Sequence, residues 1–191
     1  MVNGGDGHAH FVAEALRTLY FFAPAYAANI APVLARGHWK ALAAPIDGGR
    51  RWRGQRLLGD HKTWRGIVAG VIAGVVTYAA QWWLHRRGIA TALALVDYGR
   101  LGVFLPGALL GLGTGVGDAV KSFFKRRVDI APGASWLGFD QLDFMAGAYV
   151  FVSLVMVPPF AATIAILPLV FVGSVAGSAT GYCLGLKEAW I

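Results

Sequence analysis

The sequence is poor in cysteine and in charged residues. Its single cysteine, Cys183, can form neither a disulfide nor a thiolate metal site with another cysteine of the same chain. Charged residues make up 14% and hydrophobic residues 57%, which is far from the composition of an average soluble domain. The length of 191 residues fits one compact domain. Composition therefore predicts a single membrane domain covering residues 1–191.

A secretory signal is also absent, since the first sixteen residues contain no Lys or Arg. The alternating strands of a membrane barrel are missing too. Instead, residues 66–84 form an uncharged run of 19 and residues 144–186 an uncharged run of 43. A helix of about 20 apolar residues crosses a bilayer with its backbone polar groups satisfied. We therefore expect an all-α integral membrane protein.

Five transmembrane helices account for the apolar runs, at about residues 11–35, 66–84, 101–117, 141–158 and 163–186. The turn between the last two is the least defined, because Pro168 could equally mark a kink. Two long basic loops, 36–65 and 118–140, are separated by two spans, so both must lie on one side of the membrane. Thirteen of the 17 Lys and Arg fall on this side, counting Lys187 in the tail. The positive-inside rule makes it cytoplasmic, with the N-terminus outside and the C-terminus inside.

A net charge of +7, with Trp39 and Trp52 among basic residues, resembles a nucleic-acid surface. Because the bilayer tethers these residues, an interfacial role is the stronger interpretation, and we expect no nucleic-acid partner. Glycines at every fourth position predict close helix packing on two spans, at Gly111 and Gly115, Gly113 and Gly117, and at Gly173, Gly177, Gly181 and Gly185.

Carboxylates and cations alternate in the second loop. Asp140 and Asp143 are three residues apart at a helix start, so their Cβ atoms share one face about 5–6 Å apart. Two such carboxylates can hold Mg²⁺, whose shell substrate phosphates and waters complete. Asp118, at the end of the preceding span, could supply a third ligand. The pattern predicts a metal site at Asp118, Asp140 and Asp143.

Lys121 and Lys125 have a like-charge spacing that destabilises a helix unless an anion lies between them. A nucleoside triphosphate is such an anion. We expect Lys125 to act with the three carboxylates in catalysis. The residues predicted to contact phosphates are Lys62, Arg65, Lys121, Ser122, Arg126 and Arg127.

Simpler interpretations exist for each feature. Asp140 and Asp143 could cap a helix, and the basic residues 125–127 could anchor lipid headgroups. Lys62 and Arg65 could be positive-inside anchors, and Ser122 an ordinary interfacial serine. Capping and anchoring do not explain acids and bases alternating at one membrane edge. Together the segment favours a metal–polyphosphate site.

The order of these residues resembles the signature of integral membrane phosphatidate cytidylyltransferases, in Gly117-Asp118, Ser122, Lys125-Arg126, Pro132-Gly133 and Asp140 with Asp143. The His-Gly-Gly of those enzymes is absent, and Gln141 replaces their Arg. These departures fit a shorter archaeal family, the CDP-archaeol synthases. The motifs similar to that family cover most of the chain: Pro24-Ala25-Tyr26 with Asn29 and Pro32, residues 62–66, and residues 121–143.

This resemblance implies an Mg²⁺-dependent transfer of CMP from CTP to an unsaturated isoprenoid ether-lipid phosphate in phospholipid biosynthesis, on the cytoplasmic face of the cell membrane. One alternative is a cytidylyltransferase for other lipid phosphates. Another is a non-enzymatic lipid- or ion-translocating protein, which would carry charges inside its spans. A CDP-alcohol transferase is less supported, because residues 47–50 match only the start of its motif. The oligomeric state stays open, with a homodimer among the alternatives.

Overall fold

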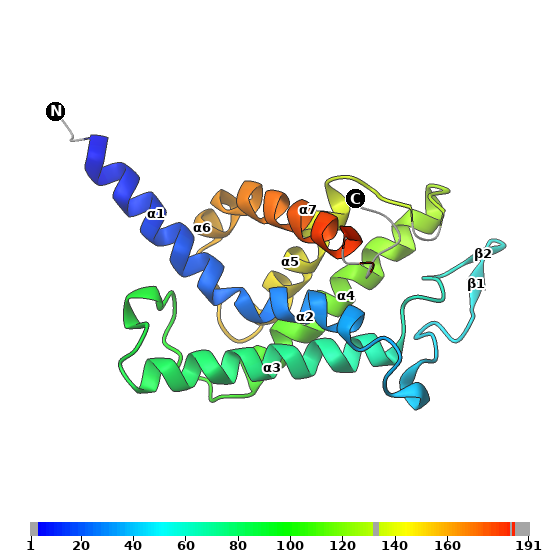
Figure 1. Ribbon diagram of the computed structural model, residues 1–191, viewed down its shortest axis with the longest axis horizontal. Helices are drawn as coiled ribbons and strands as arrows, with labels where there is room; N and C mark the ends of the chain where they lie inside the picture. The colour runs from blue at the N-terminus through cyan, green and yellow to red at the C-terminus, as the bar shows by residue number, and fades with distance from the viewer. Residues whose placement is uncertain (1–3, 132–133, 184, 186–191) are drawn as a thin grey trace.

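The computed structural model describes residues 4–131, 134–183 and 185, which are mostly helical (Figure 1). The helices are α1 Gly4–Phe21, α2 Ala23–Leu34, α3 Trp64–Arg86, α4 Leu105–Arg127, α5 Phe139–Val152, α6 Phe160–Ala165 and α7 Leu167–Cys183. Two short 3-10 turns, at Lys40–Leu42 and Thr91–Leu93, and a hairpin of strands β1 Arg51–Trp52 and β2 Gln55–Arg56 lie between them. The predicted helical class is confirmed, with the hairpin as an addition.

Prolines break two of the expected spans. The span expected at 11–35 is divided at Phe22, because Pro24 lacks an N–H and fits the first turn of a new helix. The span expected at 163–186 is divided at Ile166, and Pro168 occupies the first turn of α7. Of the two interpretations of Pro168, the structure therefore favours an interruption within the segment.

Helix α4 extends well beyond the span expected at 101–117. It continues to Arg127, and its last turn carries three basic residues that complement the negative end of the helix dipole. The expectation that residues 118–127 belong to a loop is therefore wrong. Charged residues end the apolar stretch that can lie in the membrane. They do not end the helix, because charged side chains that form ion pairs are compatible with helical backbone.

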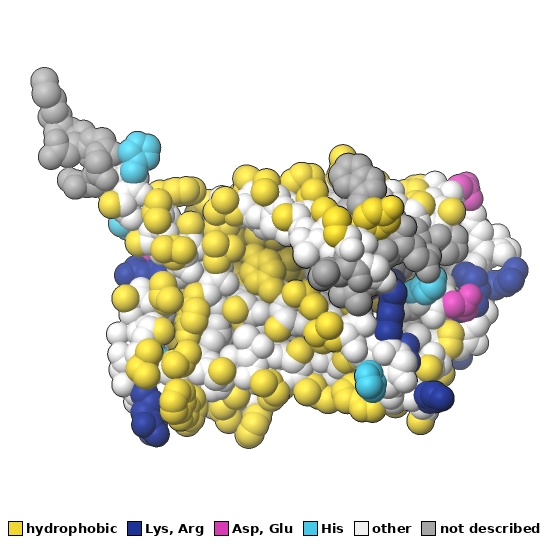
Figure 2. Space-filling model, in the orientation of Figure 1, with side chains coloured by type: hydrophobic (Ala, Val, Ile, Leu, Met, Phe, Trp, Pro, Cys, Tyr) yellow, Lys and Arg dark blue, Asp and Glu magenta, His cyan; other side chains and the backbone are white. Residues whose placement is uncertain are grey.

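In the described part of the chain, α3 is long and apolar enough to cross a membrane, by length and composition. Its 23 residues extend about 34 Å at 1.5 Å per residue. Helix α7 is a shorter apolar helix, and the 14 residues of α5 reach only about 21 Å. Figure 2 shows Lys and Arg near the two ends of the long axis, with a broad uncharged surface between them. The five-span arrangement stays a prediction.

Helix α4 packs between α3 and α5 through glycines. A Cβ added to Gly111 would lie 2.6 Å from the carbonyl oxygen of Gly70 in α3, and one added to Gly113 would overlap the Gly147 carbonyl in α5. The predicted packing of this series is confirmed. For Gly173 and Gly177 on α7 it is not, since an added Cβ meets no described atom within 4 Å.

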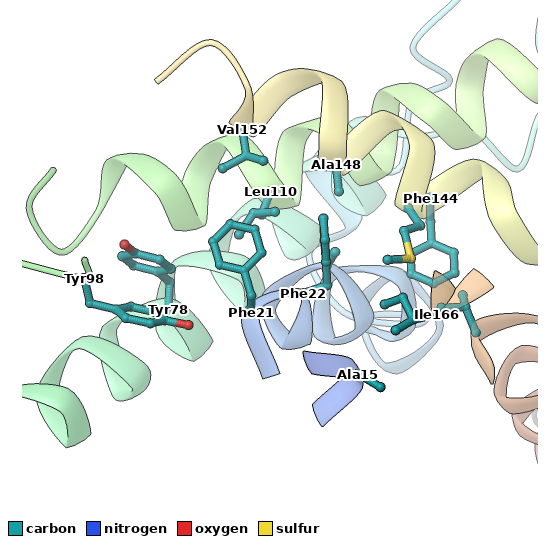
Figure 3. Close-up of a cluster of buried hydrophobic side chains, with 13 residues drawn as sticks. Ala15, Phe21, Phe22, Tyr78, Tyr98, Leu110, Phe144, Ala148, Val152 and Ile166 are labelled. Atoms are coloured by element: carbon teal, nitrogen blue, oxygen red, sulfur yellow. The ribbon is translucent and has the colours of Figure 1, made fainter. Parts of the chain in front are cut away.

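The apolar core is formed by side chains of α1, α2, α3, α4, α5 and α7, with Tyr98 and Ile166 from connecting segments (Figure 3). Phe21 and Phe22, at the break between α1 and α2, are fully buried beside Leu110 of α4 and Val152 of α5. The bend in the first segment thus places two aromatic rings in the centre of the helix assembly.

The loop between α2 and α3 and the turn between α4 and α5 lie at the same end of the molecule (Figure 1). That both face one side of a membrane stays a prediction. Gln55 Nε2 donates to Asp129 Oδ1 at 2.5 Å, and the Trp52 ring stacks on Phe123 with centroids 5.7 Å apart. The hairpin turns tightly at Arg53-Gly54, where φ is 52° and 80°, the left-handed values that glycine adopts freely. The hairpin is therefore docked on the end of α4.

Candidate functional site

Three carboxylates and three ammonium groups meet at the end of the molecule that carries the hairpin. We call this set the acid–lysine network: Asp118, Lys121 and Lys125 of α4, Asp140 and Asp143 of α5, and Lys62 just before α3. Lys121 lies at its centre. Its Nζ is 3.0 Å from Asp118 Oδ1, 2.9 Å from Asp140 Oδ1 and 2.9 Å from Asp143 Oδ2.

The other two lysines are peripheral. Lys62 Nζ donates to Asp118 Oδ2, and Lys125 Nζ donates to both Asp140 oxygens at 2.9 Å. Asp140 is thus the anion between Lys121 and Lys125 that their spacing required. The structure supplies a carboxylate where the sequence suggested a triphosphate.

Backbone packing sets the distance between the two acidic helices. A Cβ on Gly117 would overlap the carbonyl oxygen of Asp143, so α4 and α5 touch one residue from Asp118. The α5 N-terminus is capped by Gln141, whose Oε1 accepts from the Gly138 N–H at 2.7 Å. Asp140 accepts instead from the Trp136 N–H at 2.6 Å as well as from lysine. Capping alone therefore does not account for the two aspartates.

The lysines keep two of the network carboxylates, Asp118 and Asp140, ionised. Asp118 and Asp140 lie outside the spans expected at 101–117 and 141–158. Burial opposes ionisation of Asp118, but the charges of Lys62 and Lys121 outweigh it and hold the pKa of this carboxyl below its ordinary value. For Asp140, burial is outweighed by hydrogen bonds from Lys125 and the Trp136 N–H, so its pKa is also lowered. Both groups are available as anionic ligands at neutral pH.

Carboxylate oxygens are suitable ligands for a hard divalent cation. Their present separation, however, matches the ammonium group of Lys121 that lies between them. Asp143 Oδ2 is buried and makes no hydrogen bond to the described residues, leaving the Lys121 charge as its partner. Oxygen ligands bind Mg²⁺ at about 2.1 Å, whereas these oxygens lie near 3 Å from Nζ. Accordingly, within residues 4–131, 134–183 and 185 no group of three or more His, Cys, Asp or Glu is placed as it stands to hold a metal. A metal requires the carboxylates to draw together.

The remaining predicted site residues lie around the network. Ser122 is buried on α4. Arg126 is 9% exposed, and its Nε and Nη1 find no hydrogen-bond partner in the described part of the chain. Arg65 Nη1 donates to the His38 carbonyl at 3.1 Å, and Arg127 stacks 4.3 Å over the Phe123 ring. The structure therefore does not bring Arg65 and Arg127 into the network. Pro132, Gly133 and Lys187 lie outside the described residues.

Asp47 organises the loop that leads to Lys62, a role that is not among the predicted site residues. Its side chain is 1% exposed. Oδ1 accepts from the Gly49 N–H and from Arg56 Nη2, both at 3.0 Å, and Oδ2 accepts from the Leu58 N–H at 3.1 Å. The available signal was Asp-Gly-Gly, which is typical of a side-chain-stabilised turn. The loop is therefore an ordered structure.

Comparison with known proteins identifies one family. The CarS-like family, described as CDP-archaeol synthase, matches residues 11–191. The CDP-archaeol synthase of Thermococcus onnurineus is 41% identical over 138 residues, covering 71% of this chain and 73% of the relative. That of Halorubrum lacusprofundi is 42% identical over 176 residues, covering 87% and 92%.

A solved structure supports the same relationship. It is described as an intramembrane enzyme for archaeal membrane lipid biosynthesis, and it matches with a TM-score of 0.68 and 28% identity. The match covers 83% of this chain and 90% of that one. The fold and the sequence therefore point to the same group of proteins.

Proposed function

The chain belongs to the CarS-like family of CDP-archaeol synthases, which are cytidylyltransferases, and we propose how it performs this reaction. CMP passes from CTP to an unsaturated archaeal ether-lipid phosphate, 2,3-di-O-geranylgeranylglyceryl phosphate, and pyrophosphate leaves. The observation that carries the proposal is the acid–lysine network, which gathers three carboxylates and three ammonium groups at one end of the helix assembly.

In the proposed step, an oxygen of the lipid phosphate forms a bond to the α-phosphorus of CTP. The bond from that phosphorus to the oxygen bridging to the β-phosphorus breaks, and its electron pair leaves with pyrophosphate. A phosphate oxygen is already nucleophilic, so positioning and neutralisation of charge carry the catalysis. Lys62, Lys121 and Lys125 supply that positive charge, and Ser122 a hydroxyl.

Arg126 supports an anionic ligand in this region. Arg126 is a buried guanidinium whose Nε and Nη1 find no partner among the described residues, which favours an incoming phosphate oxygen because unsatisfied buried donors are costly. We assign Arg126 to the nucleotide phosphates, and Arg65 or Arg127 to the lipid phosphate. The latter two would have to leave their present contacts with the His38 carbonyl and the Phe123 ring.

Asp118, Asp140 and Asp143 are the proposed Mg²⁺ ligands. When bound, the ion would neutralise phosphate charge and polarise the reacting phosphoryl group. We propose further that the protein is multi-pass in the cell membrane, with this end on the cytoplasmic face, the N-terminus outside and the C-terminus inside. The lipid tails would then remain in the bilayer while the phosphate reaches the network.

The direct test is an assay of the purified protein with Mg²⁺, labelled CTP and lipid phosphates. The expected products are a CDP-lipid and pyrophosphate in equal amounts. Parallel assays with ATP and GTP in place of CTP measure the selectivity for the base. Comparing lipid phosphates with saturated and unsaturated tails measures the selectivity for the lipid. Turnover that continues unchanged in EDTA would refute the metal assignment.

The carboxylates are tested by Asp140→Asn and Asp143→Asn. Loss of groups that merely support metal ligands costs about 10–100-fold, so loss of a ligand charge should lower turnover by at least about 100-fold. Asp60→Asn is the control, because the Asp60 side chain is 75% exposed and pairs with Arg56 outside the network. Near wild-type turnover in either network variant, with a normal melting temperature, would refute the assignment of that aspartate as a metal ligand.

A further inference from the structure

Lys121 lies between all three network carboxylates. Neutralising phosphate charge does not require a lysine at this central position. We propose that its ammonium group fills the metal position while the nucleotide is absent, and that it leaves when metal and triphosphate arrive together. This inference rests on the proposed function, because it takes the three network carboxylates as the metal ligands. It adds that Lys121 couples metal binding to nucleotide binding.

The contacts of Lys121 are those expected of a bound cation. An ammonium group has three protons, and one oxygen from each of the three carboxylates lies 2.9–3.0 Å from its Nζ. The side chain is 12% exposed. Three carboxylates around one point resemble the ligands of a metal ion. Their oxygens lie about 1 Å farther from the lysine nitrogen than they would from Mg²⁺.

Asp143 depends most on this contact. Its side chain is 8% exposed, and among the described residues its one ion pair is with Lys121, at 2.9 Å. A buried carboxylate without a counter-charge is unfavourable. When Lys121 moves away, Asp143 needs another cation, which is the role of the metal.

The charge balance explains why the exchange needs the nucleotide. The three acids and three lysines of the network cancel, so a divalent ion alone is not attracted and meets three ammonium groups. A triphosphate brings negative charge that can receive both the metal and the displaced lysine. The long flexible stem of lysine permits such a movement. Metal and nucleotide should therefore bind cooperatively.

Lys125 is a matched control. It carries the same charge and is 9% exposed, but it contacts Asp140 alone among the network acids. Removing either lysine changes the net charge equally. If charge alone determines metal affinity, Lys121→Gln and Lys125→Gln should behave alike; if Lys121 occupies the metal position, they should differ.

The experiment measures Mn²⁺ binding to the full-length protein in detergent, without nucleotide, from the loss of the free-ion EPR signal. Lys121→Gln should bind Mn²⁺ at least about tenfold more tightly than wild type, which lies within the usual range of coupling between sites. Lys125→Gln should gain less than about threefold, which lies below that range. Equal gains in both variants, or no gain in Lys121→Gln, would overturn the proposal.

Two further measurements keep the result interpretable. Adding Asp143→Asn to Lys121→Gln should abolish the gain; a gain that persists means the ion binds elsewhere and refutes the proposal. Mg²⁺ should raise the melting temperature of Lys121→Gln more than that of wild type. A Lys121→Gln protein that fails to fold at every Mg²⁺ concentration also refutes it, because the acids would then require lysine itself. Failure here, in an enzyme whose turnover still stops in EDTA, leaves the metal assignment of the proposed function intact.

Discussion

At the scale of single residues, one arginine shows how burial changes the value of an ion pair. Arg56 pairs with Asp47 at 3.0 Å and with Asp60 at 2.6 Å. The Asp47 side chain is 1% exposed and accepts backbone N–H groups as well, whereas the Asp60 side chain is 75% exposed. Exposed pairs are screened by water, while a buried acceptor that loses its charge leaves donors unsatisfied. The shorter pair is therefore the weaker contributor.

Asp47→Asn should lower the free energy of unfolding by about 1–3 kcal/mol at pH 7. Burial raises the pKa of Asp47, but hydrogen bonds from the Gly49 and Leu58 N–H groups and from Arg56 outweigh it, so the pKa is lowered in the fold. A lowered pKa stabilises the fold above the unfolded value of about 3.9, and this contribution disappears as pH falls through the folded value.

Thermal unfolding of wild type and Asp47→Asn between pH 7 and pH 3 measures this effect. The difference in stability between wild type and Asp47→Asn should be largest at neutral pH and should shrink as the pH falls below about 4. Asp60→Asn should stay close to wild type throughout. A gap of constant size across this pH range would show that the Asp47 charge is not the cause.

At the scale of secondary-structure elements, the crossing of α4 and α5 fixes the acidic groups. Gly113 and Gly117 face α5, where an added Cβ would overlap the carbonyl oxygens of Gly147 and Asp143. Gly111 and Gly115 face α3. One glycine-rich helix thus lets two neighbours approach on different sides. The Asp143 backbone lies against Gly117, so the spacing of the network acids depends on this contact.

Gly117→Ala should therefore separate the helices beside the network. We expect a loss of about 1–3 kcal/mol in stability, as for overpacked cores, together with reduced turnover. Gly113→Ala, at the same crossing but one turn away, should cost similar stability with a smaller loss of turnover. Gly177→Ala is the control, because a Cβ there meets no described atom within 4 Å. The test is to measure the melting temperature and the turnover of all three glycine variants. Equal turnover in the Gly113 and Gly117 variants would contradict a positioning role for the contact between Gly117 and Asp143.

At the scale of the whole molecule, the face drawn in Figure 2 carries Lys and Arg toward the two ends of the long axis, with apolar side chains over much of the surface between them. The network and the hairpin lie at one end, and Arg86 and Arg87 at the other, over Trp82 and Trp83 at 5.3 and 4.9 Å. Aromatic and basic residues at a helix end suit a membrane–water interface. The two ends should therefore face opposite sides of the membrane.

Cysteine labelling tests this orientation in a Cys183→Ser background, since Cys183 is exposed. We expect Arg53→Cys, in the hairpin, to react with a membrane-impermeant maleimide only in inside-out vesicles. Ile89→Cys, which follows α3 and replaces a residue 52% exposed, should react only from the outer face. Labelling of both positions from one face would rule out the proposed topology.

The features that depend on local pattern can be predicted from the sequence. Uncharged runs predict helices, because a backbone in hydrocarbon must satisfy its own polar groups, and the three-residue spacing of Asp140 and Asp143 puts both on one helix face. The span count predicts that the two polar segments share one side of the membrane, and the order of motifs identified the family. The C-terminal limit of α4 does not follow from the sequence, because the charges that end its apolar run do not end the helix, which continues to Arg127.

Only the tertiary structure decided which groups meet. Lys62 and Asp118 are 56 positions apart, and no periodicity relates them; their contact depends on how closely α3, α4 and α5 pack. The central place of Lys121 and the docking of the hairpin on α4 follow from the same packing. The role of Asp47 is instead set inside its own loop, by contacts with Gly49, Arg56 and Leu58. The same glycine spacing leads to close contact on α4, whereas on α7 an added Cβ at Gly173 or Gly177 meets no described atom within 4 Å. Spacing defines a face of a helix but not the neighbour that covers it.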